Sequence, residues 1–543
     1  MWRLDYLAGF LTRLQGWGFT AVLLEIEDKF RFANHPALVH PDAPSHDEWK
    51  AWAGGCRAAG LEVIPLVQSL GHMEFVLSHP EYAHLREAPD LITHLDPTNP
   101  QSVPFVRELM DEVIEVFSPG AHFHIGGDET SHLGRSSRLK DEPMDALYLR
   151  QIRPVLRHVS KRGLRPLLWH DMAMSFPKIL NKIPRETLLV DWDYQTTSPR
   201  PDFLIAWGGK DGRSANPMVT WGSSYEDNVS ETFRREFERF AVDEQTRLDG
   251  TFRGFSLTDA LRSKGFDVMT ASANRSAGDQ MGIPDLRRHM ANCFWSSRKG
   301  LTEGAGHIVT SWAVRRNHPE TGQPATFAAV LAARGMEDFD PARIDREWVR
   351  ETFGTPLPDF AQAAELAAGG LRPLRNRDRA YGRSGLWSKR LKKLRSGEDT
   401  LADDLKAVCR EHGGREKTFS LTARIRRGYA RAARLLGLCQ RKARRNAGLF
   451  DFWIEGVAVQ DFYLAFLEAA LAGRLSREAV KLDRRLRRLM GLTRKVFSRT
   501  YPPHSVEQEV LARYGYHLEY LSSLKSTRHI PRSAKQALPL CIP

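Results

Sequence analysis

The sequence has few cysteines and no long apolar run. Its five cysteines are scattered over 543 residues, and none stands in the C-x-x-C spacing of a metal or redox motif. They therefore predict free thiols in a reducing compartment. No run of eighteen apolar residues occurs, and residues 1–19 place Asp and Arg within a helical period, which argues against a membrane span or a signal peptide. We expect a cytoplasmic protein with no membrane partner.

Common catalytic motifs are also missing. The sequence contains no G-x-S-x-G elbow, no P-loop, no H-E-x-x-H pair and no Rossmann fingerprint. These absences disfavour serine hydrolases of the elbow type, nucleotide-dependent enzymes and zinc peptidases. We therefore predict neither a bound metal nor an organic cofactor.

Acidic residues are scarce in the last third of the chain. Residues 371–543 carry 38 Lys and Arg against 16 Asp and Glu, a net charge of +22, which leaves −9 for the first 370 residues. A basic segment of this kind could bind nucleic acid or an acidic polymer. Its arginines lie among Leu, Ala and Phe at helical spacing, which favours a solvated basic helix face instead. A nucleic-acid partner therefore ranks last among our hypotheses.

Up to residue 335, short runs rich in Val, Leu and Ile alternate with amphipathic helical segments. This alternation is typical of a parallel α/β fold. The runs predict seven strands, at residues 19–26, 61–68, 121–126, 165–170, 188–192, 266–271 and 307–312. A TIM (β/α)8-type barrel needs eight, and the chain begins inside what reads as the first helix. We therefore predict a barrel domain over residues 1–335 whose first strand is missing from the chain.

Two further regions depart from the alternation. Residues 197–262 are polar and long enough to form an inserted loop with its own helix, which we treat as a candidate lid. From residue 336 strand patterns vanish and long helical periods appear. Residues 336–543 are therefore predicted to form an all-helical, basic C-terminal domain, joined through the charged segment 373–399.

The segment AHFHIGGDETSHLG, residues 121–134, carries the clearest chemical signal. A predicted strand ends in two glycines, Gly126 and Gly127, followed by two adjacent carboxylates, Asp128 and Glu129. In a parallel barrel the carboxyl ends of the strands form the catalytic face. Adjacent residues of an extended strand point to opposite sides, so the backbone must bend if both carboxylates are to reach one substrate. The two glycines permit such a bend.

Two neighbouring carboxylates suit one particular kind of glycoside hydrolysis. A retaining glycosidase needs an acid at the leaving oxygen and a nucleophile on the opposite face of the anomeric carbon. Neighbours cannot easily occupy both faces, but they can serve a substrate whose own 2-acetamido carbonyl oxygen attacks. Asp128 would then orient and stabilise the acetamido group, and Glu129 would act as acid and later as base. We expect the charge of Asp128 to raise the pKa of Glu129 toward the working pH.

The motif HIGGDE resembles the signature of the β-N-acetylhexosaminidases of glycoside hydrolase family 20. In addition AVLLEIEDKF, VIPLVQSLGHMEFVLSHPEYAHLRE, HLDPTNP and FHIGGDETSHLG follow the order and spacing of its hexosaminidase D-like branch, over roughly residues 1–335. The resemblance implies an exo-acting hydrolase that releases terminal GalNAc or GlcNAc through an oxazolinium intermediate. Its partner would be a carbohydrate with a terminal 2-acetamido sugar.

The resemblance and the positions at predicted strand ends add candidates for substrate binding: His72, His124, Trp169, Asp171, Trp192, Tyr194, Trp312 and Glu27. The three tryptophans would wall an apolar acetamide pocket, although any one of them could be a core residue. Tyr194 resembles the family tyrosine that hydrogen-bonds the attacking carbonyl. Asp171 could orient a neighbouring side chain or contact the substrate, and the two histidines could be polar-network or structural residues.

Two features leave alternatives open. Glu27 lies in a cluster with Glu25 and Asp28, and these carboxylates could hold sugar hydroxyls or form salt bridges. After Trp312 the chain reads AVRRNHPET, without the close carboxylate of other branches of the family, and Glu320 is too distant to assign. The competing hypothesis is therefore a catalytically impaired glycan-binding protein on a truncated barrel.

Overall fold

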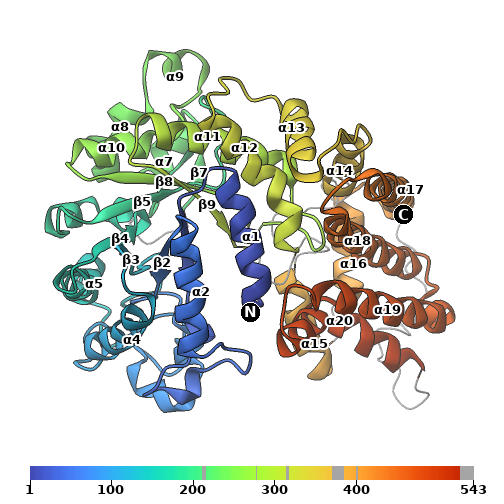
Figure 1. Cartoon of the computed structure of the whole chain (residues 1–543), viewed down its shortest axis with the longest axis horizontal. Coiled ribbons are helices and arrows are strands. Elements are labelled where there is room, and N and C mark those ends of the chain that lie inside the picture. Colours follow the sequence, from blue (N-terminus) through green and yellow to red (C-terminus); the bar gives the residue numbers. More distant parts are fainter. Residues whose placement is uncertain (211–215, 277, 313–316, 370–383, 399–400, 526–543) are drawn as a thin grey trace. The chain divides into compact units, whose positions relative to one another are not determined.

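The computed structural model describes residues 1–210, 216–276, 278–312, 317–369, 384–398 and 401–525 (Figure 1). The chain divides into two compact units. The first comprises Met1–Ser272 and Trp295–Ile308, and the second comprises Ala273–Phe294 and Val309–Pro543. In the described ranges, no helix combines the length and the apolar character that crossing a bilayer requires.

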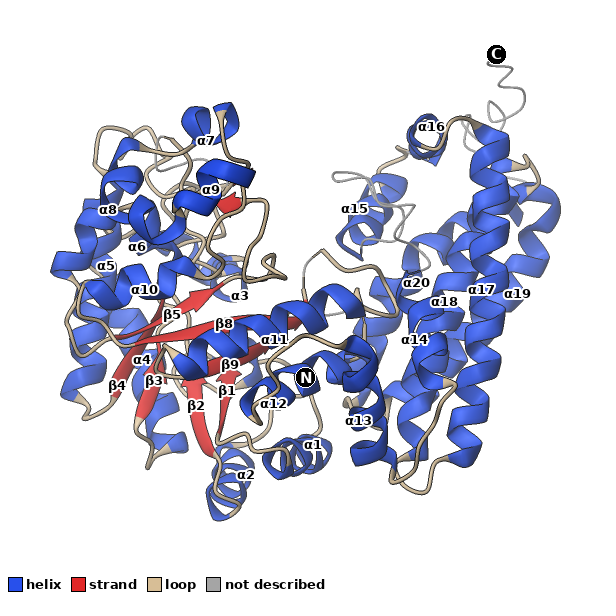
Figure 2. Ribbon diagram, turned by 90° about the horizontal axis from the view of Figure 1, so that it is seen from above, coloured by secondary structure: helices blue, strands red, loops and turns tan. Residues whose placement is uncertain are grey.

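One seven-stranded sheet contains the strands of the α/β part of the chain. The strands follow one another in chain order: β1 (Ala21–Glu25), β2 (Glu62–Leu66), β3 (His122–His124), β4 (Arg165–Trp169), β5 (Leu188–Trp192), β8 (Val268–Arg275) and β9 (His307–Ser311). Every pairing from β1 to β8 is parallel. Figure 2 shows these strands as neighbouring arrows in one curved sheet. All seven predicted strands are confirmed, and the arrangement is barrel-like. A further strand before residue 1 stays a prediction.

Helices alternate with these strands (Figure 1). Those before the insertion are α1 (Leu4–Gly16), α2 (His46–Ala58), α3 (Glu74–Leu77), α4 (Ser102–Phe117), α5 (Met144–Lys161) and α6 (Asp171–Ser175), and α11 (Leu286–Thr302) lies between β8 and β9. Helix α4 buries Val106, Leu109, Met110 and Val113, which recur at the helical period. Apolar spacing therefore fixes which face of the helix packs inward.

The predicted insertion at residues 197–262 is a small folded element. It contains an antiparallel pair, β6 (Leu204–Ile205) and β7 (Met218–Val219), followed by α7 (Ser223–Asn228), α8 (Glu231–Ala241), α9 (Glu244–Asp249) and α10 (Ser256–Ser263). Phe233 and Phe237, one turn apart on α8, are both buried. The insertion therefore has a packed interior, and its role as a lid stays a prediction.

From Pro319 onward the described residues form helices only, as predicted for the C-terminal region. They are α12 (Gln323–Ala333), α13 (Pro341–Phe353), α14 (Phe360–Gly369), α15 (Ser384–Arg395), α16 (Leu401–Glu411), α17 (Arg415–Lys442), α18 (Phe450–Leu471), α19 (Leu475–Phe497) and α20 (Pro503–Lys525). Helix α18 is apolar on nearly every side and almost entirely buried, because it packs between α17 and α19. Most of the predicted connecting segment 373–399 lies outside the described residues, and the boundary after residue 335 stays a prediction.

Candidate active site

The backbone after β3 bends as the two glycines predict. Gly126 and Gly127 have φ angles of +66° and +85°, and Glu129 itself has a φ of +51°. A Cβ atom on Gly126 would lie 1.9 Å from Oε1 of Gln68. Left-handed conformations are costly for residues with a side chain, so a non-glycine residue such as Glu129 is held there by its surroundings.

Gly126→Ala is expected to destabilise the fold by about 2–4 kcal/mol, because it adds a steric clash to left-handed strain. Gly163→Ala is the matched control. Gly163 has a similar φ of +78°, but a Cβ there would meet nothing within 4 Å, so only the strain of roughly 1 kcal/mol applies. Urea unfolding of both variants measures the difference. Equal losses would show that Gln68 does not constrain Gly126.

Both carboxylates of the motif contact the same histidine. Nε2 of His72 lies 3.3 Å from Oδ2 of Asp128 and 3.4 Å from Oε2 of Glu129. His72 follows β2 in a left-handed conformation, with φ +53°. The preceding Gly71 packs so closely that a Cβ atom there would lie 2.4 Å from the carbonyl oxygen of Asp128. The loop after β2 therefore packs directly against the turn that carries Asp128 and Glu129, and His72 contacts both carboxylates.

The shared contact controls the ionisation of the cluster. Burial opposes the charged imidazolium, but hydrogen bonds and charge from Asp128 and Glu129 outweigh it and raise the pKa of His72 to about 11. The hydrogen bond from His72 lowers the pKa of Glu129, against the effect of burial. The expectation that Asp128 raises the pKa of Glu129 is therefore wrong for this structure. The contact with His72, and not the charge of Asp128, therefore dominates the pKa of Glu129.

A further carboxylate, that of the buried Asp171, bonds to the backbone of the turn that carries Asp128 and Glu129. Asp171 begins α6 just after β4, and its Oδ2 accepts a hydrogen bond of 2.9 Å from the backbone N–H of Glu129. Its Oδ1 accepts one of 3.4 Å from Nε1 of Trp192. Burial, with a contribution from the charge of Asp128, raises the pKa of Asp171 to about 8. Of the two roles that the sequence left open, this geometry supports orientation of neighbouring groups.

The acidic cluster at the end of β1 divides into two parts. Glu25 accepts a hydrogen bond of 3.0 Å from Nε2 of Gln68, and burial together with the charges of Glu27 and Asp128 raises the pKa of Glu25 to about 7. Glu27, the residue selected from the sequence, instead forms an ion pair with Lys29. Gln68 was missed, although its position just after a strand was the signal used for the other candidates.

Aromatic side chains lie beside Asp171, which accepts a hydrogen bond from Trp192. Trp192, at the end of β5, stacks on Tyr194 with ring centroids 5.1 Å apart and planes at 28°. Trp207 packs edge-on against Trp192 at 4.6 Å. Trp169, at the end of β4, is buried, with its ring 4.4 Å from that of His124. Trp207 comes from the insertion, which the sequence showed only as a polar loop, so it could not be selected in advance.

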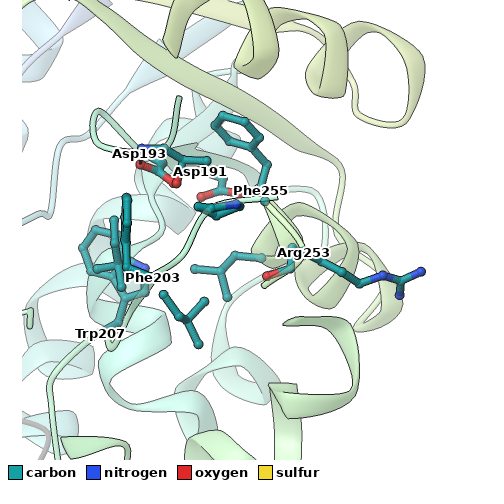
Figure 3. A pocket seen from close by; sticks show the side chains of 13 residues that line it. Asp191, Asp193, Phe203, Trp207, Arg253 and Phe255 are labelled. Carbon is teal, nitrogen blue, oxygen red and sulfur yellow. Dashed lines mark hydrogen bonds between the residues drawn. The ribbon is translucent and has the colours of Figure 1, made fainter. Parts of the chain in front are cut away.

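A small pocket lies beside Trp207 (Figure 3). Asp191 and Asp193 occupy one end, Phe203 and Phe255 contribute rings, and the guanidinium of Arg253 points away from it. Asp191 accepts a hydrogen bond of 2.7 Å from the hydroxyl of Thr258. Burial raises the pKa of Asp191 to about 7. Asp191 and Asp193 both accept hydrogen bonds from protein groups. We therefore assign this pocket no ligand and regard its residues as packing behind Trp207 and Trp192.

The remaining candidates divide between the two units. His124 is fully buried, its Nδ1 accepts a hydrogen bond of 2.9 Å from the N–H of Gly126, and burial lowers the pKa of His124 to about 3. A neutral ring in this position fits the structural alternative, because it supports the glycine turn. Trp312 follows β9 in the second unit, and its substrate role stays a prediction. Residues 313–316, part of the departure noted after Trp312, lie outside the described residues.

Within the described ranges, no group of three or more His, Cys, Asp or Glu side chains is placed to hold a metal ion. Within the described residues, no disulfide joins Cys56, Cys293, Cys409 or Cys439, whereas Cys541 lies outside them.

Comparison with known proteins agrees with the predicted resemblance. Residues 56–201 match the model of the glycosyl hydrolase family 20 catalytic domain. Hexosaminidase D of Bos taurus is 35% identical over 203 residues, covering 35% of this chain and 58% of that protein. Hexosaminidase D of Homo sapiens is 33% identical over 204 residues, covering 35% and 42%. The chain thus spans about half the length of these curated relatives.

Among solved structures, the chitobiase of Flavobacterium johnsoniae aligns over 94% of this chain and 75% of its own. The TM-score is 0.44 and the sequence identity is 15%. Likeness at this level is too weak to support a conclusion about function.

Proposed function

We propose, from the family 20 match of residues 56–201, that this chain is an exo-acting retaining glycosidase that releases a terminal N-acetylhexosamine. One observation carries the proposal. Oδ1 of Asp128 is buried and has no hydrogen-bond partner in the described part of the chain, while Oδ2 is held by His72. A buried carboxylate oxygen without a donor is unfavourable. The N–H of a 2-acetamido group would supply that donor.

The mechanism follows from this orientation. Asp128, by accepting the amide N–H, turns the acetamido carbonyl oxygen toward the anomeric carbon. That oxygen bonds to the anomeric carbon as the glycosidic bond breaks, and Asp128 offsets the positive charge that develops on the oxazolinium ring. Glu129 gives a proton to the leaving oxygen and then removes one from the water that opens the ring. Trp192 and Tyr194 would form the pocket wall.

The proton for this step is shared between His72 and Glu129. The two neighbouring carboxylates raise the pKa of His72 to about 11, which favours a protonated imidazole. Transfer across the 3.4 Å contact would deliver it from Nε2 of His72 to Oε2 of Glu129 when the leaving oxygen is in place. On this proposal His72 would hold the proton that Glu129, whose own pKa is lowered, delivers to the leaving oxygen.

Hydrolysis of aryl 2-acetamido-2-deoxy-β-glycosides tests the proposal. We expect turnover of the N-acetylgalactosaminide, the N-acetylglucosaminide or both, and little turnover of matched glycosides with a 2-hydroxyl group. A thiazoline that mimics the cyclised intermediate should inhibit competitively. Equal turnover of both substrate sets would contradict substrate-assisted catalysis. Calorimetric binding of these sugars without hydrolysis would support the impaired glycan-binding hypothesis instead.

His72→Gln is expected to move the basic limb of the kcat/KM–pH profile to lower pH by several units. Without the histidine, the transferable proton must sit on Glu129 alone, and a carboxyl group loses its proton near pH ~4.3 when unperturbed. The wild-type pair keeps its proton because the pKa of His72 is raised to about 11. A uniform loss of rate with no shift of the limb would indicate a purely structural role for His72.

A further inference from the structure

Helix α19 carries a straight row of cations. Arg477, Lys481, Arg484, Arg488 and Lys495 follow at intervals of four, three, four and seven residues, and all five are exposed. At 3.6 residues per turn these positions fall on one face of the helix, over a length of roughly 27 Å. The opposite face is buried and includes Leu482, Leu486, Leu489 and Val496. We call the five cations the α19 stripe.

The other arginines of α19 each have a carboxylate partner. Arg487 contacts Asp483 at 3.0 Å, and Arg494 forms two hydrogen bonds of 2.7 and 2.8 Å with Glu507. Arg485 contacts Asp461, and Arg474, which directly precedes α19, contacts Glu478.

No such carboxylate faces the α19 stripe within the described residues. Like charges three or four positions apart on a helix repel one another. Among the described residues, carboxylates thus neutralise the flanking arginines but none pairs with the stripe. An external anion would remove this repulsion.

The form of the stripe indicates a linear polyanion. Guanidinium groups bind sulfate and carboxylate with paired hydrogen bonds, and a row of them suits a chain that carries such groups at intervals. The residues around the stripe do not suit the other polyanions. In the described ranges no aromatic side chain is among the large exposed hydrophobics, so nucleic-acid bases have no stacking platform. Val480 and Leu511 are exposed, but two isolated aliphatic side chains do not make a membrane-inserting face.

We propose that the α19 stripe binds an acidic polysaccharide, a chain of sulfated or carboxylated sugars. The preference for a sugar chain over nucleic acid rests on the proposed function, because a glycan that ends in an N-acetylhexosamine would be partner and substrate in one molecule. The binding itself does not depend on turnover. Binding and hydrolysis can therefore fail separately.

Heparin oligosaccharide is the probe, titrated into the full chain by calorimetry between about 50 and 200 mM salt. R484Q/R488Q removes two stripe charges, and R487Q/R494Q, the matched control, removes two arginines of the same helix that are also exposed but have carboxylate partners. We expect the stripe variant to weaken heparin binding by about tenfold and to reduce the slope of log affinity against log salt by about two. The control should change affinity less than about twofold. Circular dichroism checks that both variants fold.

The titration, competing ligands and the hydrolysis assay each have an outcome that would contradict the proposal. Equal losses in the two variants would overturn it and leave a solvated basic face. Duplex DNA, a single-stranded oligonucleotide or phosphatidylserine vesicles that bind more tightly than heparin at the same salt would assign the surface to a different partner. Hydrolysis of the aryl 2-acetamido glycoside should be unchanged in both variants. Intact hydrolysis without heparin binding would refute the stripe proposal alone, and heparin binding without hydrolysis would refute the proposed function alone.

Discussion

Glu129→Gln is expected to lower kcat on 2-acetamido glycosides by about a hundredfold to ten-thousandfold, the usual contribution of a general acid and base. Glutamine keeps the shape of the side chain and a contact with His72, but it cannot give up a proton. The loss should be smallest for nitrophenyl leaving groups, which depart without protonation, and largest for alkyl or sugar leaving groups. Measuring kcat across such a series of aglycones tests the role directly.

Glu115→Gln serves as the control for this variant. Glu115 is an exposed glutamate on α4, outside the catalytic motif, so its activity should match that of the unmodified chain. A loss in Glu129→Gln that is the same for every leaving group would exclude proton donation by Glu129. Full activity with alkyl aglycones would show that another group is the acid.

Asp128→Asn is expected to lower kcat by about a hundredfold to a thousandfold, as for loss of one electrostatic contact to the transition state. The neutral amide cannot offset the charge of the oxazolinium ring. The NH2 group of asparagine donates hydrogen bonds, so where it faces the acetamido N–H the two donors would repel each other. The affinity for the thiazoline inhibitor should fall in parallel, because that inhibitor carries the same cyclised ring.

The comparison between substrates makes the second test specific. Preference for 2-acetamido over 2-hydroxyl glycosides should largely disappear in Asp128→Asn, since the residue acts only through the acetamido group. If the preference and the thiazoline affinity stay unchanged while kcat falls, Asp128 does not contact that group. Circular dichroism and urea unfolding separate either result from loss of the fold.

The sequence alone determined the strands of the sheet and the location of the glycine turn before Asp128. Each of the seven strands is a short apolar run between turn residues, and this local pattern is sufficient because neighbouring residues decide it. Gly126 and Gly127 likewise predicted the bend from local sequence, since only glycine adopts positive φ angles at low cost. Asp128 and Glu129 could therefore be selected before any contact was known.

Tertiary structure decided how those acids are held and charged. The contact with His72, which lowers the pKa of Glu129, joins loops after two different strands, and no local pattern encodes it. Asp171 and Gln68 reach the turn in the same way, and Trp207 reaches Trp192 from an insertion of irregular pattern. Periodicity reports which face of a segment is buried, whereas pKa values and hydrogen bonds depend on which distant segments meet. The sequence therefore pointed to Asp128 and Glu129, whereas their protonation and the contacts of their turn with Gln68, Asp171 and His72 depend on the tertiary structure.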